Sequence, residues 1–388
     1  MNVSLNDVAG NGVRNRRMYL FLLTLTIAST VAFQGWRTLY NNFAVDVAGL
    51  SGLQNGMVQS LREVPGFLSL LVIYLLFFIS EHRLAALSVA ILGLGTAATG
   101  FFPSYYGLIF TVLAMSFGFH YYETLNQSLT LQYFDRTTAP IIFGRLRGIA
   151  SGINLLVGGA VFAMSLFLDF KGMYVVMGGL VVVVGLWCAT RNPTDRDLPP
   201  QHKKMVFKRR YWLYYALTFL AGARRQVFVA FAVFLMVSKF NYTVRDITVL
   251  FVVNNVINWY LSPAIGRAVN RFGERPVLTL EYAALLVIFT GYAFTDSWLV
   301  AGALYVLDHI FFNFALAIRT YFQKIADPAD IAPSMAVGFT INHIAAVVIP
   351  ALGGALWLVD YRIVFLGAAG LAFLSLLFTQ CIPSRRNQ

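Results

Sequence analysis

The sequence predicts an all-α membrane protein with about twelve transmembrane helices, arranged as two pseudo-symmetric six-helix bundles. Three observations lead to this class. The 388 residues are 58% hydrophobic and only 12% charged, which is roughly half the charge of an average soluble domain. Apolar stretches of about 20 residues, long enough to cross a bilayer, follow one another along the chain. One long polar segment, residues 191–210, divides these stretches near the middle of the sequence.

The polar segment is predicted to be a cytoplasmic linker between an N-terminal bundle, residues 1–190, and a C-terminal bundle, residues 211–388. Pro193, Pro199 and Pro200 prevent a continuous helix there, and the basic residues that follow are expected to contact an anionic leaflet. With the N-terminus inside, roughly 20 of the 29 Lys and Arg residues fall in inside loops and tails, as the positive-inside rule requires. Both termini are therefore expected to be cytoplasmic.

The net charge of +12 is spread over loops and does not form a basic domain, so no nucleic-acid partner is expected. The expected environment is the lipid bilayer, in a multi-pass protein of a bacterial inner membrane. Cys188 and Cys381 are the only cysteines. They indicate neither a disulfide nor a thiolate metal site, and no cofactor is expected.

In the N-terminal half, apolar stretches predict helices over about residues 18–44, 55–80, 84–101 and 105–134, then a glycine-rich helix from about residue 148 and a helix over about 172–190. Gln34, Arg37 and Asn41 recur at helical spacing and give the first helix a polar face. Ionisable groups inside a span usually face the bundle interior or a water-filled cavity. These three residues are therefore candidates for binding a solute, and the alternative for Arg37 is that its side chain reaches the outer surface.

Two further polar groups stand out in this half. Arg62 and Glu63 are adjacent in the second helix and point about 100° apart, so each is expected to find its partner on another helix. His120 and Glu123 are three residues apart on one face of the fourth helix. A histidine beside a carboxylate suits a proton relay, and the alternative for His120 is a hydrogen bond between helices.

In the C-terminal half, helices are expected over about residues 211–240, 244–269, 276–294, 298–326 and 333–359, with a last helix that ends near residue 381. The polar residues inside these spans are Arg224, Arg225, Asn254, Asn258, Asp308, His309, Asn313, Arg319 and His343. The two halves echo one another at an offset of about 190 residues, which indicates duplication of a six-helix unit.

The segment Gly266-Arg-Ala-Val-Asn-Arg-Phe-Gly-Glu-Arg275 lies between the eighth and ninth predicted helices. It resembles the Gly-x-x-x-Asp-Arg-x-Gly-Arg-Arg loop of the major facilitator superfamily of secondary transporters, with Asn270 in place of the usual Asp. The resemblance covers nearly the whole chain and implies a monomer that works by alternating access. It assigns a gating loop to Gly266, Arg267, Asn270, Arg271, Gly273 and Arg275.

The family also implies a central cavity lined by the first, fourth, seventh and tenth helices, with the second, fifth, eighth and eleventh at its sides. The ionisable residues inside the spans fall on these eight helices. The third, sixth, ninth and twelfth helices are expected to be almost free of charge within the membrane.

The arginines inside the spans outnumber the carboxylates, which favours a cavity of positive potential and an anionic or zwitterionic organic solute. The predicted solute-binding residues are Gln34, Arg37, Asn41, His120, Arg224, Arg225, Asn254, Asn258, Asn313, Arg319 and His343. The predicted proton-coupling residues are Glu123, Asp308 and His309, although another coupling ion is possible in principle.

Two alternatives stay open. An exporter of a transition metal or metal chelate with the same fold would use His120, Glu123, Asp308, His309 and His343 as ligands. A membrane receptor without transport activity is the other. No nucleotide-binding loop or nucleophile motif is visible, so enzymatic activity is not expected.

Overall fold

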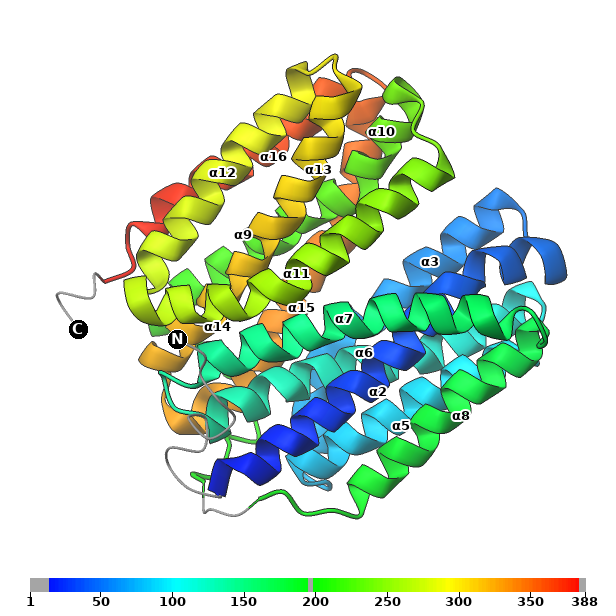
Figure 1. Ribbon diagram of the computed structural model, residues 1–388. Coiled ribbons are helices and arrows are strands. Elements are labelled where there is room, and N and C mark those ends of the chain that lie inside the picture. Colours follow the sequence, from blue (N-terminus) through cyan, green and yellow to red (C-terminus); the bar gives the residue numbers. More distant parts are fainter. Residues whose placement is uncertain (1–13, 195–197, 384–388) are drawn as a thin grey trace. The chain divides into compact units, whose positions relative to one another are not determined.

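The computed structural model describes residues 14–194 and 198–383, and all regular secondary structure in these ranges is helical (Figure 1). Ten helical segments are long and apolar enough to cross a membrane. The prediction of an all-α protein built from membrane-spanning helices is therefore confirmed. Twelve spans, two six-helix bundles and cytoplasmic termini stay predictions, and the outermost terminal residues lie outside the described ranges.

The helices of the N-terminal half follow the predicted stretches closely. They are α2 (Arg14–Asn42) with the π-helix η1 (Phe43–Val47), α3 (Gly52–Phe67), the 3-10 helix η2 (Leu68–Leu71), α4 (Val72–Leu75), α5 (Glu81–Thr99), α6 (Tyr105–Tyr133), α7 (Ala139–Met164) and α8 (Phe170–Ala189). Side chains cap several of them: Ser51 forms a capping box with Gln54 at the start of α3, and Ser104 accepts a hydrogen bond from Gly107 N in α6. Pro65 lies inside α3, and α geometry gives way to η2 shortly after it.

The C-terminal half contains more interrupted helices. They are the 3-10 helix η3 (Arg209–Tyr211), α9 (Trp212–Val227), the π-helix η4 (Phe228–Ala232), α10 (Val233–Phe240), α11 (Val244–Phe272), α12 (Glu274–Phe294), α13 (Trp298–Phe312), the 3-10 helix η5 (Asn313–Ala315), α14 (Leu316–Ile325), the 3-10 helix η6 (Pro328–Asp330), α15 (Ile331–Trp357) and α16 (Tyr361–Thr379). The predicted seventh helix is thus α9, η4 and α10, and the predicted tenth is α13, η5 and α14.

By packing, the chain separates into two compact units. Unit 1 comprises residues 1–138, 149–206 and 327–340, and unit 2 comprises residues 139–148, 207–326 and 341–388. The beginning of α7 thus belongs to unit 2 and the beginning of α15 to unit 1. Nothing in the sequence indicates this exchange of helix ends between the units. The domain boundaries at either end of the linker stay a prediction.

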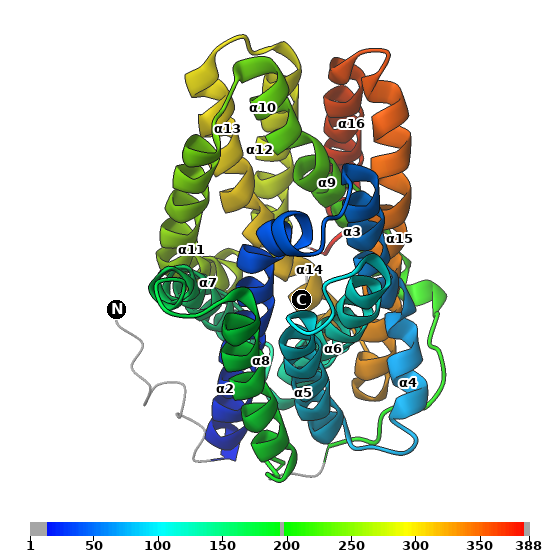
Figure 2. The ribbon, with the colours of Figure 1, turned by 90° about the vertical axis from the view of Figure 1, so that its right-hand side faces the viewer.

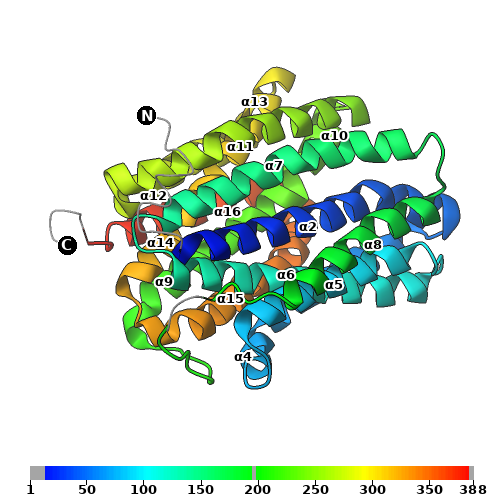
Figure 3. The ribbon, with the colours of Figure 1, turned by 60° about the horizontal axis from the view of Figure 1, so that its bottom comes forward.

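Each unit has a core of closely packed helices. In unit 1, α5 lies against α6 (Figure 2) and beside α8 (Figure 3). A Cβ at Gly93 of α5 would stand only 2.7 Å from the backbone N of Val182 in α8, so a glycine is needed for this approach. In unit 2, α12 packs along α16.

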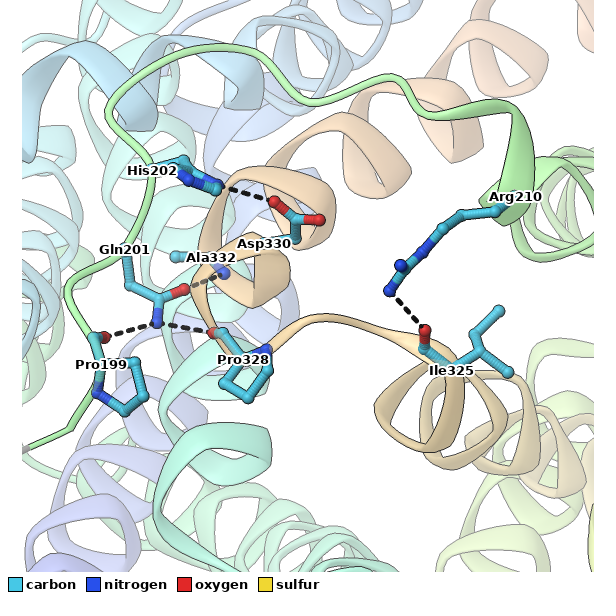
Figure 4. A network of polar contacts seen from close by, with 8 residues as sticks. All are labelled: Pro199, Gln201, His202, Arg210, Ile325, Pro328, Asp330 and Ala332. Atoms are coloured by element: carbon cyan, nitrogen blue, oxygen red, sulfur yellow. Dashed lines mark hydrogen bonds and ion pairs between the residues drawn. The ribbon is translucent and has the colours of Figure 1, made fainter. Parts of the chain in front are cut away.

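The part of the linker in unit 1 is fastened to the start of α15 (Figure 4). Gln201 Nε2 donates to the carbonyl of Pro328 at 2.8 Å, and Gln201 Oε1 accepts from Ala332 N at 2.9 Å. His202 Nδ1 lies 2.7 Å from Oδ1 of the fully buried Asp330. This part of the linker is therefore a strap with specific contacts and not a free tether.

The part of the linker in unit 2 is also held, because Arg210 Nη2 donates to the carbonyl of Ile325 at the end of α14 (2.9 Å; Figure 4). A cation at a helix C-terminus satisfies a free carbonyl and complements the helix dipole. Lys203 and Lys204 are exposed, so contact with an anionic leaflet remains a prediction.

Candidate functional site

A pocket within unit 2 gathers four ionisable side chains from three helices. It is lined by Ala221, Arg224 and Arg225 of α9, Glu281, Leu285 and Phe289 of α12, Asp308 and Phe312 of α13, and Ala315 of η5. Arg224, Glu281 and Asp308 are only 3%, 1% and 2% exposed. Burying three charged groups in a membrane-spanning bundle is costly, and such groups usually mark a solute or ion pathway.

Arg224 is the centre of this pocket. Its Nη2 lies 3.8 Å from Glu281 Oε1, and its guanidinium carbon lies 4.3 Å from the centre of the Tyr282 ring. Its Nε donates to the carbonyl of Leu220 at 3.2 Å. Asp308 lines the same pocket. The guanidinium thus lies beside the carboxylate of Glu281, and a cation–π contact with Tyr282 holds it in place.

Part of the hydrogen-bonding capacity of this cluster is unused. Arg224 Nη1, Glu281 Oε2 and Asp308 Oδ2 are buried and, among the side chains that the structure describes, have no hydrogen-bond partner. A buried charged atom without a partner carries a desolvation cost of about 1–3 kcal/mol or more. Such atoms in a pocket are the groups that a solute or ion is expected to satisfy.

The helices that line the pocket lose α geometry next to it. The π-helix η4 begins three residues after Arg225, and the 3-10 helix η5 begins five residues after Asp308. π-Helical segments are rare and are frequent at functional sites. At η5, Asn313 Nδ2 donates to the carbonyl of His309 (2.8 Å) and to Asn258 Oδ1 (2.7 Å), which holds the distortion in place.

The predicted gating loop is largely helical. α11 continues to Phe272, so Gly266, Arg267, Asn270 and Arg271 lie on its last turns, and only Gly273, with a φ of 86°, turns the chain into α12. The predicted helix ended near residue 269, so α11 is three residues longer than expected, and the gating role of this segment stays a prediction. A Cβ at Gly266 would collide with the carbonyl of Pro140 in α7.

Comparison with known proteins gives a clear result for the fold. Neither a protein-family model nor a curated protein sequence matches the chain. Solved structures do. The Escherichia coli fucose:proton symporter FucP matches with a TM-score of 0.74 at 13% identity, over 94% of this chain and 98% of that chain. The human organic anion transporter MFSD10 matches with a TM-score of 0.71 at 12% identity, over 94% and 99%.

A bacterial homologue of the iron transporter ferroportin matches with a TM-score of 0.76 at 13% identity, over 94% of this chain and 98% of that chain. The chain has the major facilitator fold. At these identities the likeness shows the fold and not the solute.

Within the major facilitator fold, the structure brings three of the predicted site residues together. Arg224, Arg225 and Asp308 all line the pocket of unit 2. Arg225 is half-buried, in contrast to Arg224. Their positions within the predicted spans indicated that all three lie inside the membrane. Only the packing of the helices shows that they share one pocket.

Other predicted residues of unit 2 lie outside the pocket lining. Asn258 and Asn313 form a hydrogen-bonded pair, and Arg147 Nε donates to Asn313 Oδ1 at 3.2 Å. Arg319 lies over the ring of Phe143, with its guanidinium carbon 5.7 Å from the ring centre. The remaining three are His309, whose ring packs against Phe228 and Tyr305, and the buried Asn254 and His343.

The predicted residues of unit 1 do not form a comparable cluster. Gln34 is buried and donates to Thr38 Oγ1 at 3.2 Å, while Arg37 and Asn41 are exposed. His120 is buried, and its ring packs edge-on against Phe119 and Phe339. The remaining residue, Glu123, is half-buried.

Two expectations were wrong. Arg62 and Glu63 pair with each other, with Nη2 and Oε1 2.8 Å apart, because the long arginine side chain folds back across the angle between neighbouring helical positions. The ninth helix is not free of charge, because Glu281 lies buried in α12. A lone carboxylate within the apolar stretch from Val277 to Phe294 was the signal that identifies it.

Proposed function

We propose that this protein is a secondary active transporter of the major facilitator superfamily. It moves a small organic anion or zwitterion across a membrane by alternating access, coupled to protons. The observation that carries the proposal is the pocket of unit 2, where Arg224, Arg225, Glu281 and Asp308 meet inside apolar helices. The proteins that share its fold include a fucose:proton symporter, an organic anion transporter and a bacterial homologue of the iron transporter ferroportin.

Arg225 is the best candidate in the pocket for binding the solute. It lines the pocket and is less buried than Arg224, whose Nη2 lies 3.8 Å from Glu281 Oε1. A guanidinium binds a carboxylate or phosphate through two parallel hydrogen bonds. Gln34, Arg37, Asn41, His120, Asn254, Asn258, Asn313, Arg319 and His343 remain further candidates, and the Gly266–Arg275 segment remains the candidate gate.

Asp308 is the best candidate for proton coupling. It is buried, and its Oδ2 is available for a proton within the described part of the pocket. Glu123 and His309 are the other candidates from the sequence. The protein is further proposed to act as a monomer with twelve spans in a bacterial inner membrane, with both termini inside and without enzymatic activity.

Export of a transition metal or its chelate is the second candidate function. The ferroportin homologue has the same fold, and Asp308 and His309 are adjacent potential ligands. Two arginines in the pocket oppose a bare cation, so a chelate with negative charge fits this alternative better. A receptor without transport activity is the least supported alternative.

The test begins with a thermal-shift screen of the purified protein against organic anions, sugars, chelators and divalent metals, because a ligand of the folded state raises its stability. Hits are then assayed for uptake into proteoliposomes under an imposed pH gradient. We expect Arg225→Ala to abolish both stabilisation and uptake, while Arg136→Ala, which removes an exposed arginine, leaves them unchanged. Stabilisation by metals or chelates alone would favour the second candidate, and binding without movement would favour a receptor.

A further inference from the structure

Glu281, which was not among the predicted site residues, changes the charge balance of the pocket. Arg224 and Arg225 carry two positive charges, and Glu281 and Asp308 carry two negative charges. With all four groups ionised, the pocket is neutral. Other titratable groups on the helices packed around it are found on every neighbouring helix: Tyr214 and Tyr215 of α9, Lys239 of α10, Asp246, Tyr260, Arg267 and Arg271 of α11, Glu274, Arg275, Tyr282 and Tyr292 of α12, Tyr305 and His309 of α13, Arg319, Tyr321 and Lys324 of α14, His343 of α15, and Tyr361 and Arg362 of α16.

Several of the surrounding groups make contacts outside the pocket. Lys324 pairs with Glu274 at 2.7 Å, Arg319 lies over Phe143, and Tyr361 accepts a hydrogen bond from Lys239. Tyrosines are neutral at ordinary pH. The four ionised side chains of the pocket therefore decide its net charge.

We infer that Glu281 and Asp308 together form a proton site of two carboxylates, which takes up one proton for each negative charge that the solute brings to Arg225, up to two protons. This inference rests on the proposed function and adds the coupling stoichiometry and a role for Glu281. Arg224 is the counter-ion of the carboxylates and not a ligand of the solute.

The argument is electrostatic. An anion bound at Arg225 gives the neutral pocket a net negative charge, and uncompensated charge at this depth is costly. A proton bound by either carboxylate restores neutrality. Hydronium on one side of the membrane transfers a proton to Glu281 or Asp308 and becomes water. The carboxylic acid later releases this proton to water on the other side.

The geometry allows the two carboxylates to share this role. Glu281 and Asp308 line the same pocket, and Arg224 Nη2 lies 3.8 Å from Glu281 Oε1. Ionisable groups that interact in one site titrate as a pair. Glu281 Oε2 and Asp308 Oδ2, both buried without a partner, are the atoms on which the proton is placed.

Charge counting predicts the behaviour of four variants. Glu281→Gln and Asp308→Asn each leave the pocket with one excess positive charge, so an anion binds without a proton. The double variant Arg224→Gln/Glu281→Gln restores neutrality with Arg225 and Asp308 alone, so the anion again requires a proton. Asp296→Asn, which removes a carboxylate that is 85% exposed in a loop, is the matched control.

The transport assay uses proteoliposomes with radiolabelled lactate, which carries one negative charge, and succinate, which carries two. Counterflow reports movement without a gradient, and uptake under a pH gradient reports coupling. We expect Glu281→Gln to retain counterflow within about twofold of the wild type, to lose accumulation and to lose the dependence of solute affinity on pH. The double variant is expected to regain accumulation, and the wild type to move one proton with lactate and two with succinate, as read by an internal pH dye.

A second measurement needs no solute. Infrared difference spectra of the purified protein between low and high pH should show the carbonyl stretch of a protonated carboxylic acid that weakens in Glu281→Gln and in Asp308→Asn. A band unchanged in both variants, or accumulation that survives Glu281→Gln, overturns the inference. If the wild type moves neither anion, the proposed function fails and the stoichiometry fails with it, whereas a failed inference alone leaves anion counterflow intact.

Discussion

Lys324 Nζ lies 2.7 Å from Oε2 of the buried Glu274 and joins the last turn of α14 to the first turn of α12. The other half of the chain has a counterpart. Gln132 Nε2 donates to Glu81 Oε2 at 2.8 Å and joins the last turn of α6 to the first turn of α5. The two contacts stand at corresponding positions of the predicted duplication. They agree with the internal repeat that the sequence predicts.

The ion pair between Glu274 and Lys324 predicts an asymmetric response to mutation. Glu274 is 3% exposed, whereas the Lys324 side chain is 22% exposed. Lys324→Met leaves a buried carboxylate without its partner and should lower the free energy of unfolding by about 3 kcal/mol. Glu274→Gln leaves a lysine that reaches water, and its effect should be clearly smaller.

Unfolding of the two variants in denaturing detergent measures this difference. The double variant Lys324→Met/Glu274→Gln should recover part of the loss, because no buried charge remains. Equal losses in the two single variants would show that the pair contributes through packing and not through the buried charge.

The contact between Gly266 and Pro140 predicts that even one methyl group is not tolerated there. Gly266→Ala forces α11 away from the start of α7 and should lower the free energy of unfolding by about 1–3 kcal/mol. Gly158→Ala is the matched control, because a Cβ at that position in α7 meets nothing within 4 Å. The control should be neutral or slightly stabilising, since alanine favours the helix. A neutral Gly266→Ala variant would contradict the close approach.

The hydrogen bond between Asn313 and Asn258 predicts energetic coupling between η5 and α11. Asn313→Ala removes bonds to Asn258, His309 and Arg147 and should lower the free energy of unfolding by about 1–3 kcal/mol. In a double-mutant cycle with Asn258→Ala, the coupling energy should exceed about 0.5 kcal/mol. Additive effects would mean that the two side chains act independently.

The strap made by Gln201 and His202 predicts how the linker responds to protease. Gln201→Ala/His202→Ala removes the side-chain contacts to Pro328, Ala332 and Asp330, so trypsin should cleave the linker at Lys203 and Lys204 faster than in the wild type. Thr194→Ala, which removes a hydroxyl that donates to Asn192 Oδ1, is the control. Equal cleavage rates in all three proteins would show that the strap does not restrain the linker.

Transport by the Arg225 variant separates the roles of the two arginines. Arg225→Lys keeps the charge but loses the planar fork, so solute affinity should fall about tenfold or more while proton coupling persists. Arg224→Lys should instead lower stability, because its guanidinium stacks on Tyr282 and faces Glu281. Thermal unfolding and counterflow of both variants distinguish these outcomes, and a loss of affinity in Arg224→Lys at full stability would reverse the assignment.

Much of this protein was already determined by its sequence. The length and apolarity of successive stretches predicted helices that cross a membrane, because backbone polar groups inside a bilayer must form hydrogen bonds within the protein. Proline and charge marked the linker, and the cost of burying Arg224, Arg225 and Asp308 marked them as functional candidates. The length of an apolar stretch, the prolines and charges of a linker, and a charged residue inside a span can all be read from a residue and its neighbours along the chain.

The tertiary structure alone decided which of these groups meet. Glu281 and Arg224 belong to different helices, and helical periodicity gives the side of a helix but not the helix that packs against it. The packing likewise decided that Arg319 lies over Phe143 and that Glu274 pairs with Lys324. The physical reason is that partners are set by the packing of helices and by the reach of long side chains, and neither is encoded in spacing along one helix.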